Sequence, residues 1–249
     1  MFRVYFILFL IAHILGDFYL QNSKMAKKKM ESIKWVFLHV LCHWSVMLVI
    51  YLPMMSWEYA LGVTIVAILH CFIDIVKNIL YKKWKHKITQ VLDRNLFFID
   101  QSLHITILIG ISYWLAINKE QLILSVAFVN FFQTIGIAPM QILTWILAIL
   151  IIHKPANIAI SKLLMIYRPV EEGEGKKRTI SAGMLIGTLE RMLMLIFLII
   201  GQYPSIGLVL TAKSIARYDR ITKERDFAEY YLLGTLMSTV VAIIVSIIF

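Results

Sequence analysis

Long apolar stretches recur along the chain, each too uniform to be one face of a soluble amphipathic helix. In the first half they cover residues 4–19, 33–52, 57–80 and 96–116. A membrane-spanning helix needs about 20 predominantly apolar residues, so each stretch predicts one span. The pattern therefore predicts an all-α, polytopic integral membrane protein whose first four helices form a bundle.

The second half of the chain is less regular. Its apolar stretches are 122–137, 140–152, 156–166, 180–203, 205–220 and 230–249, and several are short. We expect about eight transmembrane helices in all, since a short stretch can belong to a tilted or broken span. We divide the chain into a four-helix transmembrane bundle, residues 1–120, and a C-terminal helical region, residues 121–249, that carries a charged segment at 168–179.

Composition supports a membrane location. The chain is 60% hydrophobic with a mean hydropathy of +0.78, and its net charge is +10. The basic segments Lys24–Lys29 and Lys82–Lys87 follow the first and third apolar stretches. The positive-inside rule assigns both basic segments to the cytoplasm. We therefore expect a multi-pass protein of the bacterial cytoplasmic (inner) membrane. Its excess positive charge would meet membrane lipids and not nucleic acid.

Four pairs of metal-capable residues, each four positions apart, interrupt the first four apolar stretches. The pairs are His13 and Asp17, His39 and His43, His70 and Asp74, and Asp100 and His104. Residues at i and i+4 share one helix face. In an up-down-up-down bundle all four pairs lie at one depth, near the cytoplasmic face. Interhelical packing or a proton relay are alternative explanations.

Imidazole and carboxylate groups gathered from facing helices are typical of a metal centre. The donor set suits a divalent transition metal, with zinc first and manganese or iron as alternatives. Eight groups are more than the ligands that one tetrahedral site needs. We therefore expect either two ions or one ion whose ligands are oriented by some of the carboxylates. An aspartate that is not a ligand, Asp74 or Asp100, is the expected general base.

Further charged residues form a possible anion subsite for a lipid phosphate or polyprenyl phosphate headgroup. They are Lys77, Glu190, Arg191, Lys213 and Arg217. Lys77 has an alternative interpretation, in which it extends to the lipid headgroups. The other four have one as well, namely ordinary salt bridges at helix ends.

These motifs resemble those of an uncharacterised bacterial membrane family, domain of unknown function 3307. The resemblance rests on His-x3-Asp-x3-Gln at 13–21 with the lysines that follow, His-x3-His at 39–43, His-x3-Asp at 70–74 and Asp-Gln-x2-His at 100–104. Segments 187–191, 211–217 and 229–236 look like the longer members of that family. The family is in turn distantly similar to membrane-bound metal-dependent hydrolases, which implies a bound metal.

The resulting expectation is a membrane-embedded, metal-dependent hydrolase that acts at the cytoplasmic face on a lipid or lipid-phosphate substrate. Two alternatives use the same residues. One is a transporter or channel for metal ions or protons, in which the His/Asp layer acts as a relay. The other is a non-enzymatic membrane sensor whose metal only stabilises the bundle.

Overall fold

A computed structural model describes residues 1–52, 56–84, 88–118, 125–169 and 179–249, and every element in these ranges is a helix. In chain order the elements are α1 (Phe2–Ile14), η1 (Leu15–Leu20), α2 (Ser23–Glu31), α3 (Ile33–Tyr51), α4 (Trp57–Trp84), α5 (Gln90–Asn118), α6 (Val126–Ile135), α7 (Pro139–Leu163), η2 (Leu164–Tyr167), α8 (Thr179–Ile199), α9 (Tyr203–Ile215), α10 (Tyr218–Lys223) and α11 (Arg225–Ser246). The predicted all-α class is confirmed.

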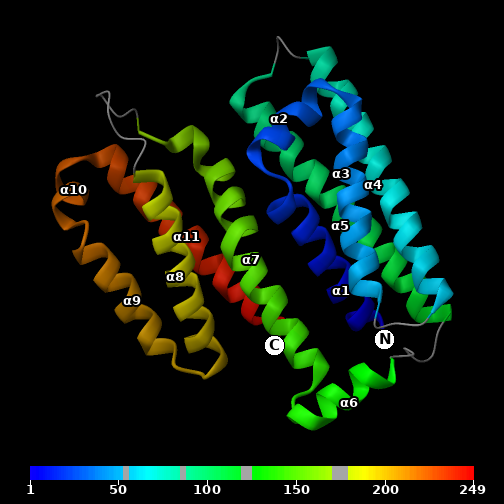
Figure 1. The fold of residues 1–249 in the computed structure, drawn as a ribbon. Helices are drawn as coiled ribbons and strands as arrows, with labels where there is room; N and C mark the ends of the chain where they lie inside the picture. The colour runs from blue at the N-terminus through cyan, green and yellow to red at the C-terminus, as the bar shows by residue number, and fades with distance from the viewer. Residues whose placement is uncertain (53–55, 85–87, 119–124, 170–178) are drawn as a thin grey trace. The chain divides into compact units, whose positions relative to one another are not determined.

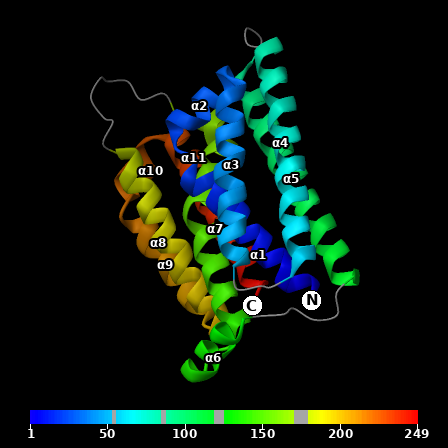
Figure 2. The ribbon, with the colours of Figure 1, turned by 45° about the vertical axis from the view of Figure 1, so that its right-hand side comes forward.

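The chain separates into two compact units, Met1–Leu147 and Ala148–Phe249, and the division falls within α7. In the first unit α1, α3, α4 and α5 lie side by side, while α2 packs on α3 and α4 at one end of the four (Figure 1; Figure 2). Away from that end the bundle has an apolar core, in which the rings of Phe9 and Tyr59 stack 5.1 Å apart. In the second unit α8 packs against both α9 and α11.

Seven helices among the described residues are long and apolar enough to cross a membrane. They are Phe2–Leu20, Ile33–Ile50, Trp57–Trp84, Gln90–Asn118, Pro139–Tyr167, Ala182–Ile199 and Arg225–Ser246. In α4 the apolar Ile68 and Phe72 are 63% and 65% exposed, whereas His70 and Asp74 are buried. This inverted distribution is what a multi-pass membrane protein requires, because its outer surface meets hydrocarbon.

Two helices differ from the sequence prediction. Residues 140–152 and 156–166, expected as separate stretches, lie in one continuous helical segment: α7 continues through Pro155 to Leu163, and η2 (Leu164–Tyr167) follows directly. Proline removes one helical hydrogen bond, and in membrane helices neighbouring groups compensate. The carbonyl that loses its helical donor at Pro155 is that of Ile151, and the neighbouring Ile152 carbonyl accepts a 2.9 Å hydrogen bond from the Arg191 side chain of α8. Of residues 122–137, those from 125 onward are described, and this described part contains the ten-residue helix α6.

The basic segment after the first span lies outside the predicted apolar stretches, yet it is also helical. It forms α2, whose first turn is capped by Asn22: the Asn22 side chain accepts a hydrogen bond of 2.8 Å from the Met25 backbone N–H. Such a cap satisfies a donor that the helix leaves unpaired. Of the predicted charged segment 168–179, residues 170–178 lie outside the described residues.

Candidate metal centre

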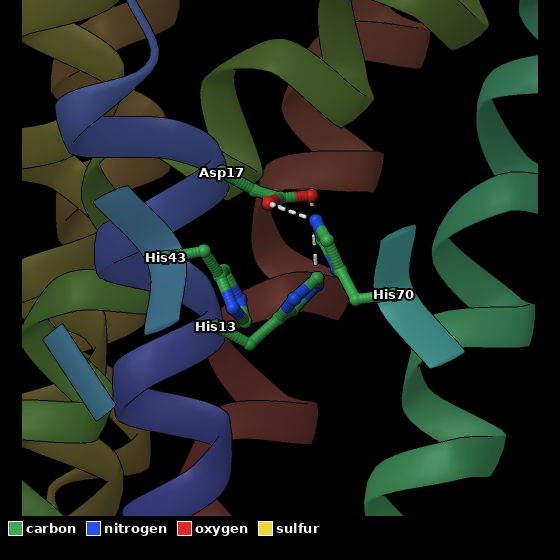
Figure 3. A group of neighbouring side chains, drawn as sticks. All are labelled: His13, Asp17, His43 and His70. Carbon is green, nitrogen blue, oxygen red and sulfur yellow. Dashed lines mark ion pairs between the residues drawn. The ribbon is translucent and has the colours of Figure 1, made fainter. Parts of the chain in front are cut away.

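All eight residues of the four i, i+4 pairs meet in one buried cluster in the first unit. Each is at most 9% exposed. The contributing elements are α1 and η1 for the first pair, α3 for the second, α4 for the third and α5 for the fourth. Figure 3 shows His13, Asp17, His43 and His70 converging from α1, η1, α3 and α4. The centroid of the His70 ring lies 4.2 Å from those of both His43 and His104, so His70 is central to the cluster.

The first span changes its helical geometry at the cluster. Residues Leu15–Leu20 form a π-helical turn, in which the Gln21 N–H reaches the Gly16 carbonyl five residues earlier at 3.2 Å. Such turns are rare and often occur at functional sites. The turn carries Asp17, whose Oδ1 lies 3.2 Å from His39 Nε2 and 3.6 Å from His70 Nε2. The π-helical turn thereby places a carboxylate beside the histidine side chains of α3 and α4.

Two imidazole nitrogens form the centre of the cluster. His39 Nε2 and His70 Nε2 are 3.1 Å apart. Besides the Asp17 oxygen, Asp74 Oδ2 lies 3.6 Å from the first nitrogen and 3.4 Å from the second. Metal–ligand bonds of about 2.0–2.1 Å separate neighbouring ligands of a tetrahedral zinc ion by about 3.3–3.4 Å. The observed separations of 3.1–3.6 Å are therefore those of a donor set able to hold one such ion.

Several other nitrogen and oxygen atoms of the cluster that could bind a metal have no hydrogen-bond partner among the described residues. They are both ring nitrogens of His43, His13 Nδ1, His104 Nε2 and Asp100 Oδ1. In His104 the other nitrogen, Nδ1, is 2.8 Å from the Asp100 carbonyl, which can only accept, so Nδ1 carries the proton and Nε2 keeps its lone pair. Buried polar atoms are almost always paired. A bound ion or its water ligands would supply the partners.

Short distances link further members of the set. Ligand atoms lie within 4.8 Å of one another in three overlapping groups: His13, Asp17, His43 and His70; His39, His70 and Asp74; and Asp74, Asp100 and His104. All eight residues that the sequence analysis selected thus belong to at least one group. His70 belongs to the first two groups and Asp74 to the last two, and both residues lie on α4.

Two lysines neutralise two of the three aspartates. Lys29 of α2 donates to both carboxylate oxygens of Asp74 at 2.9 Å each, and Lys77 Nζ lies 2.6 Å from Asp100 Oδ2. Burial disfavours the charged ammonium, but the carboxylates of Asp74 and Asp17 outweigh this effect, and the pKa of Lys29 is raised. The interpretation of Lys77 as extending to the headgroups is wrong in this structure, because its side chain is only 15% exposed and pairs with Asp100.

The sequence analysis did not assign Lys29 to the site. It is only 5% exposed, and its backbone carbonyl accepts a 2.6 Å hydrogen bond from Asn78. Nothing in the run of three lysines at 27–29 distinguishes the third, and only the docking of α2 on α4 does so. Gln101, the glutamine of the Asp-Gln-x2-His motif, also contacts the cluster, which the four-pair pattern did not predict. Its amide donates to Asp17 and Asp100 and accepts from His13, each at 3.3 Å.

Gly16 allows α3 to approach the π-turn, and replacing it by alanine should disturb the cluster. A Cβ at this position would overlap His43 Cδ2, so the ring must move. Overpacking of this kind typically costs about 1–3 kcal/mol. We expect Gly16→Ala to lower the apparent Tm of the purified protein in detergent.

Gly110, in the middle of α5, provides the matched control. Nothing lies within 4 Å of a Cβ built there, so Gly110→Ala should leave the protein as stable or raise its stability by up to about 1 kcal/mol. Equal Tm values for the two variants would mean that the close contact between Gly16 and His43 is unimportant.

The predicted anion subsite is divided between the two units. Lys77 belongs to the first unit, whereas the other four residues belong to the second. There Lys213 Nζ pairs with Glu190 Oε2 at 2.6 Å, and Arg217 is exposed between α9 and α10. Arg191 is 2% exposed and donates to Asn157 at 2.7 Å, to Ser238 at 3.2 Å and to the Ile152 carbonyl. Its donors are used to join α8 to α7 and α11.

Comparison with known families identifies the first part of the chain. The family model described as "Protein of unknown function (DUF3307)" matches residues 5–133, more than half of the 249 residues. The chain belongs to this family. The matched region contains all eight residues of the buried cluster, as well as Lys29, Lys77 and Gln101. No curated protein and no solved structure gives a significant match.

Proposed function

We propose that this protein is a membrane-embedded, metal-dependent hydrolase that acts on a lipid or lipid-phosphate substrate. One observation carries the proposal: two buried imidazole nitrogens, on His39 and His70, lie 3.1 Å apart between the carboxylates of Asp17 and Asp74. Ionisable groups inside membrane helices are costly and usually functional. The preferred ion is zinc, with manganese or iron as alternatives, because nitrogen and oxygen donors are mixed and no thiolate contributes.

The residues of the cluster have distinct roles in this proposal. A divalent ion would polarise the phosphoryl or acyl oxygen and lower the pKa of a bound water. His39, His70 and Asp17 would hold the ion, and Asp74 or Asp100 would take the proton from the attacking water. Water would then add to the phosphorus or acyl carbon, the ester bond would break, and the leaving alcohol would receive a proton.

The substrate class follows from the surroundings of the cluster. Lys29 and Lys77 add positive charge beside the carboxylates, as sites for phosphate esters commonly do. The helices that carry the site are apolar on the outside, so an amphiphile with a phosphate headgroup could approach from the bilayer. We propose the cytoplasmic face of the bacterial inner membrane as the location, because the basic α2 lies at the end of the bundle next to the cluster.

Transport remains the second candidate, and one observation favours it. Polar contacts of 3.6 Å or less connect side chains in the order Lys77, Asp100, Gln101, Asp17, His70, Asp74 and Lys29. A connected series of polar groups that are mostly titratable, here interrupted only by the Gln101 amide, is typical of a proton or ion relay inside a membrane protein. The same residues would then move an ion instead of activating water.

The deciding experiment compares turnover with flux in one preparation. We expect the purified protein to retain one or two transition-metal ions per chain. We also expect it to release phosphate from phosphatidic acid or polyprenyl phosphate in mixed micelles, to lose this activity with a chelator and to regain it with zinc. Asp74→Asn and Asp100→Asn test the proposed bases. Absence of turnover together with zinc or proton flux in liposomes would establish the transporter, and retained metal with neither activity would indicate a structural metal.

A further inference from the structure

We propose that the buried cluster holds two divalent ions, which the Asp17 carboxylate bridges, and that this centre takes a phosphate monoester headgroup. The inference rests on the proposed function, because it adds a second ion to the one assigned to His39, His70 and Asp17. Enzymes that act on phosphate esters often hold two ions about 3.5–4 Å apart.

The rings of His43 and His70 are placed to serve different ions. They stack face to face, with their centroids 4.2 Å apart and their planes only 15° from parallel. An ion bound by an imidazole lies close to the plane of that ring, because the lone pair of the nitrogen lies in the plane. No ion can lie in two planes that are stacked on each other. An ion on His43 is therefore separate from an ion on His70, and the offset between the rings is close to the spacing of a two-metal centre.

The two oxygens of Asp17 are directed towards two different sets of imidazoles. Oδ1 lies 3.2 Å from His39 Nε2 and 3.6 Å from His70 Nε2. Oδ2 is the oxygen nearer to His13, whose Nε2 is 3.9 Å away. In Figure 3 separate dashed lines join Asp17 to His70 and to His13. A carboxylate that bridges two ions gives one oxygen to each, and Asp17 is placed to do so.

The second ion would be held by His13, His43 and Asp17. Ligand atoms of these three residues lie within 4.8 Å of one another, and all three side chains are buried. Both ring nitrogens of His43 and Nδ1 of His13 have no hydrogen-bond partner among the described residues. A single ion on His39 and His70 would leave these nitrogens without a partner, although buried polar atoms are almost always paired. A second ion supplies the partner.

The two sets of ligands differ in number and in spacing. In the first set the carboxylates of Asp17 and Asp74 both lie 3.2–3.6 Å from the nitrogens of His39 and His70. The second set has three protein ligands within the wider limit of 4.8 Å. We therefore expect the first ion to bind tightly and the second ion to bind only at a higher metal concentration.

The charge of a two-ion centre favours a dianionic substrate. With neutral imidazoles, the three aspartates and two lysines of the cluster carry a net charge of minus one. Two divalent ions change this charge to plus three, which is costly inside a bilayer unless anions compensate it. A phosphate monoester carries about 1.5–2 negative charges at pH 7, whereas a phosphodiester carries one and a carboxylic ester none. We therefore infer that the substrate is a lipid phosphate monoester.

The experiment titrates the full-length, metal-free protein in detergent with Co²⁺. Equilibrium dialysis counts the bound ions, and EPR spectroscopy reports their separation, because two Co²⁺ ions bridged at about 4 Å couple magnetically and lose the signal of isolated ions. The variants His43→Ala and His13→Gln, on different helices, each remove a ligand of the second ion alone. Ser45→Ala is the matched control, because Ser45 is exposed on α3 close to His43.

We expect the wild type and Ser45→Ala to bind two Co²⁺ ions, the second about tenfold more weakly, and to lose EPR signal as the second ion binds. His43→Ala and His13→Gln should each bind one ion and keep the spectrum of the first, which also shows that they are folded. Either variant is sufficient if the other does not fold. Inorganic phosphate should tighten binding of the second ion by the wild type about threefold or more, since ligands that stabilise each other bind reciprocally.

A wild type that binds one ion, or two ions without magnetic coupling, would overturn the inference, as would a His43→Ala variant that still binds two coupled ions. In these cases the metal centre of the proposed function would stand with one ion. A second ion whose affinity does not respond to phosphate would overturn the assignment of a phosphate monoester. Failure of the wild type to bind any Co²⁺ would instead refute the metal centre, and with it the proposed function.

Discussion

Replacing His70 by alanine should reduce the zinc content of the purified protein at least tenfold. His70 Nε2 lies within 3.6 Å of donor atoms on His39, Asp17 and Asp74, so its removal takes a ligand from the middle of the set. Loss of residues that merely orient a ligand already lowers metal affinity by about 10–100-fold. The measurement is elemental analysis after dialysis of each variant against a fixed zinc concentration.

His153→Ala is the control for this prediction. His153 is exposed and belongs to the second unit, outside the family match and the cluster. The zinc content of the His153→Ala variant should equal that of the wild type. If His70→Ala also kept its zinc, hydrogen bonding between helices would be the better explanation of the cluster. If His70→Ala lost its zinc but kept hydrolytic activity, the metal would be structural.

Replacing Arg191 by leucine should destabilise the second unit by about 3 kcal/mol or more, since hydrogen bonds to a charged group contribute about 1.5–3 kcal/mol each. Arg191 is 2% exposed, and the change leaves its acceptors on Asn157, Ser238 and Ile152 without their donor. For a chain of this size we expect the apparent Tm to fall by about 6–12 °C.

Arg225→Leu is the matched control. Arg225 pairs with Glu229 at 3.1 Å, but the two side chains are 90% and 65% exposed. Exposed pairs contribute at most about 1 kcal/mol, so the Tm should change little. An Arg191→Leu variant as stable as Arg225→Leu, but defective in binding lipid phosphate, would support the anion subsite and contradict the structural role.

The amino-acid sequence was sufficient to predict the helical class and the members of the buried cluster. Both predictions depend on periodicity. Apolar runs of membrane length require helices, because the bilayer offers no partners to an unpaired backbone. Within such a run a polar residue is costly on the lipid side, so residues like His39 and Asp100 must face the interior. The i, i+4 spacing then directs both members of a pair into one layer.

Basic residues and a helix-breaking proline were harder to place. Lys29 lies in a segment whose neighbours are exposed lysines, and its burial depends on where α2 docks. The sequence placed Arg191 in a predicted anion subsite, but helices distant in the chain supply its hydrogen-bond partners. Pro155 suggested a break in α7, and the helix nevertheless continues.

By itself the sequence thus determined that the chain is helical and apolar on its outside, and which His and Asp side chains must turn inward. Only the tertiary structure decided which of these inward groups contact one another, that Lys29 and Lys77 neutralise two of the aspartates, and that Arg191 is enclosed by α7, α8 and α11. The physical reason is the range of the interactions. Burial along one helix follows a local period, whereas a salt bridge such as Lys29–Asp74 joins residues 45 positions apart and forms only when helices pack.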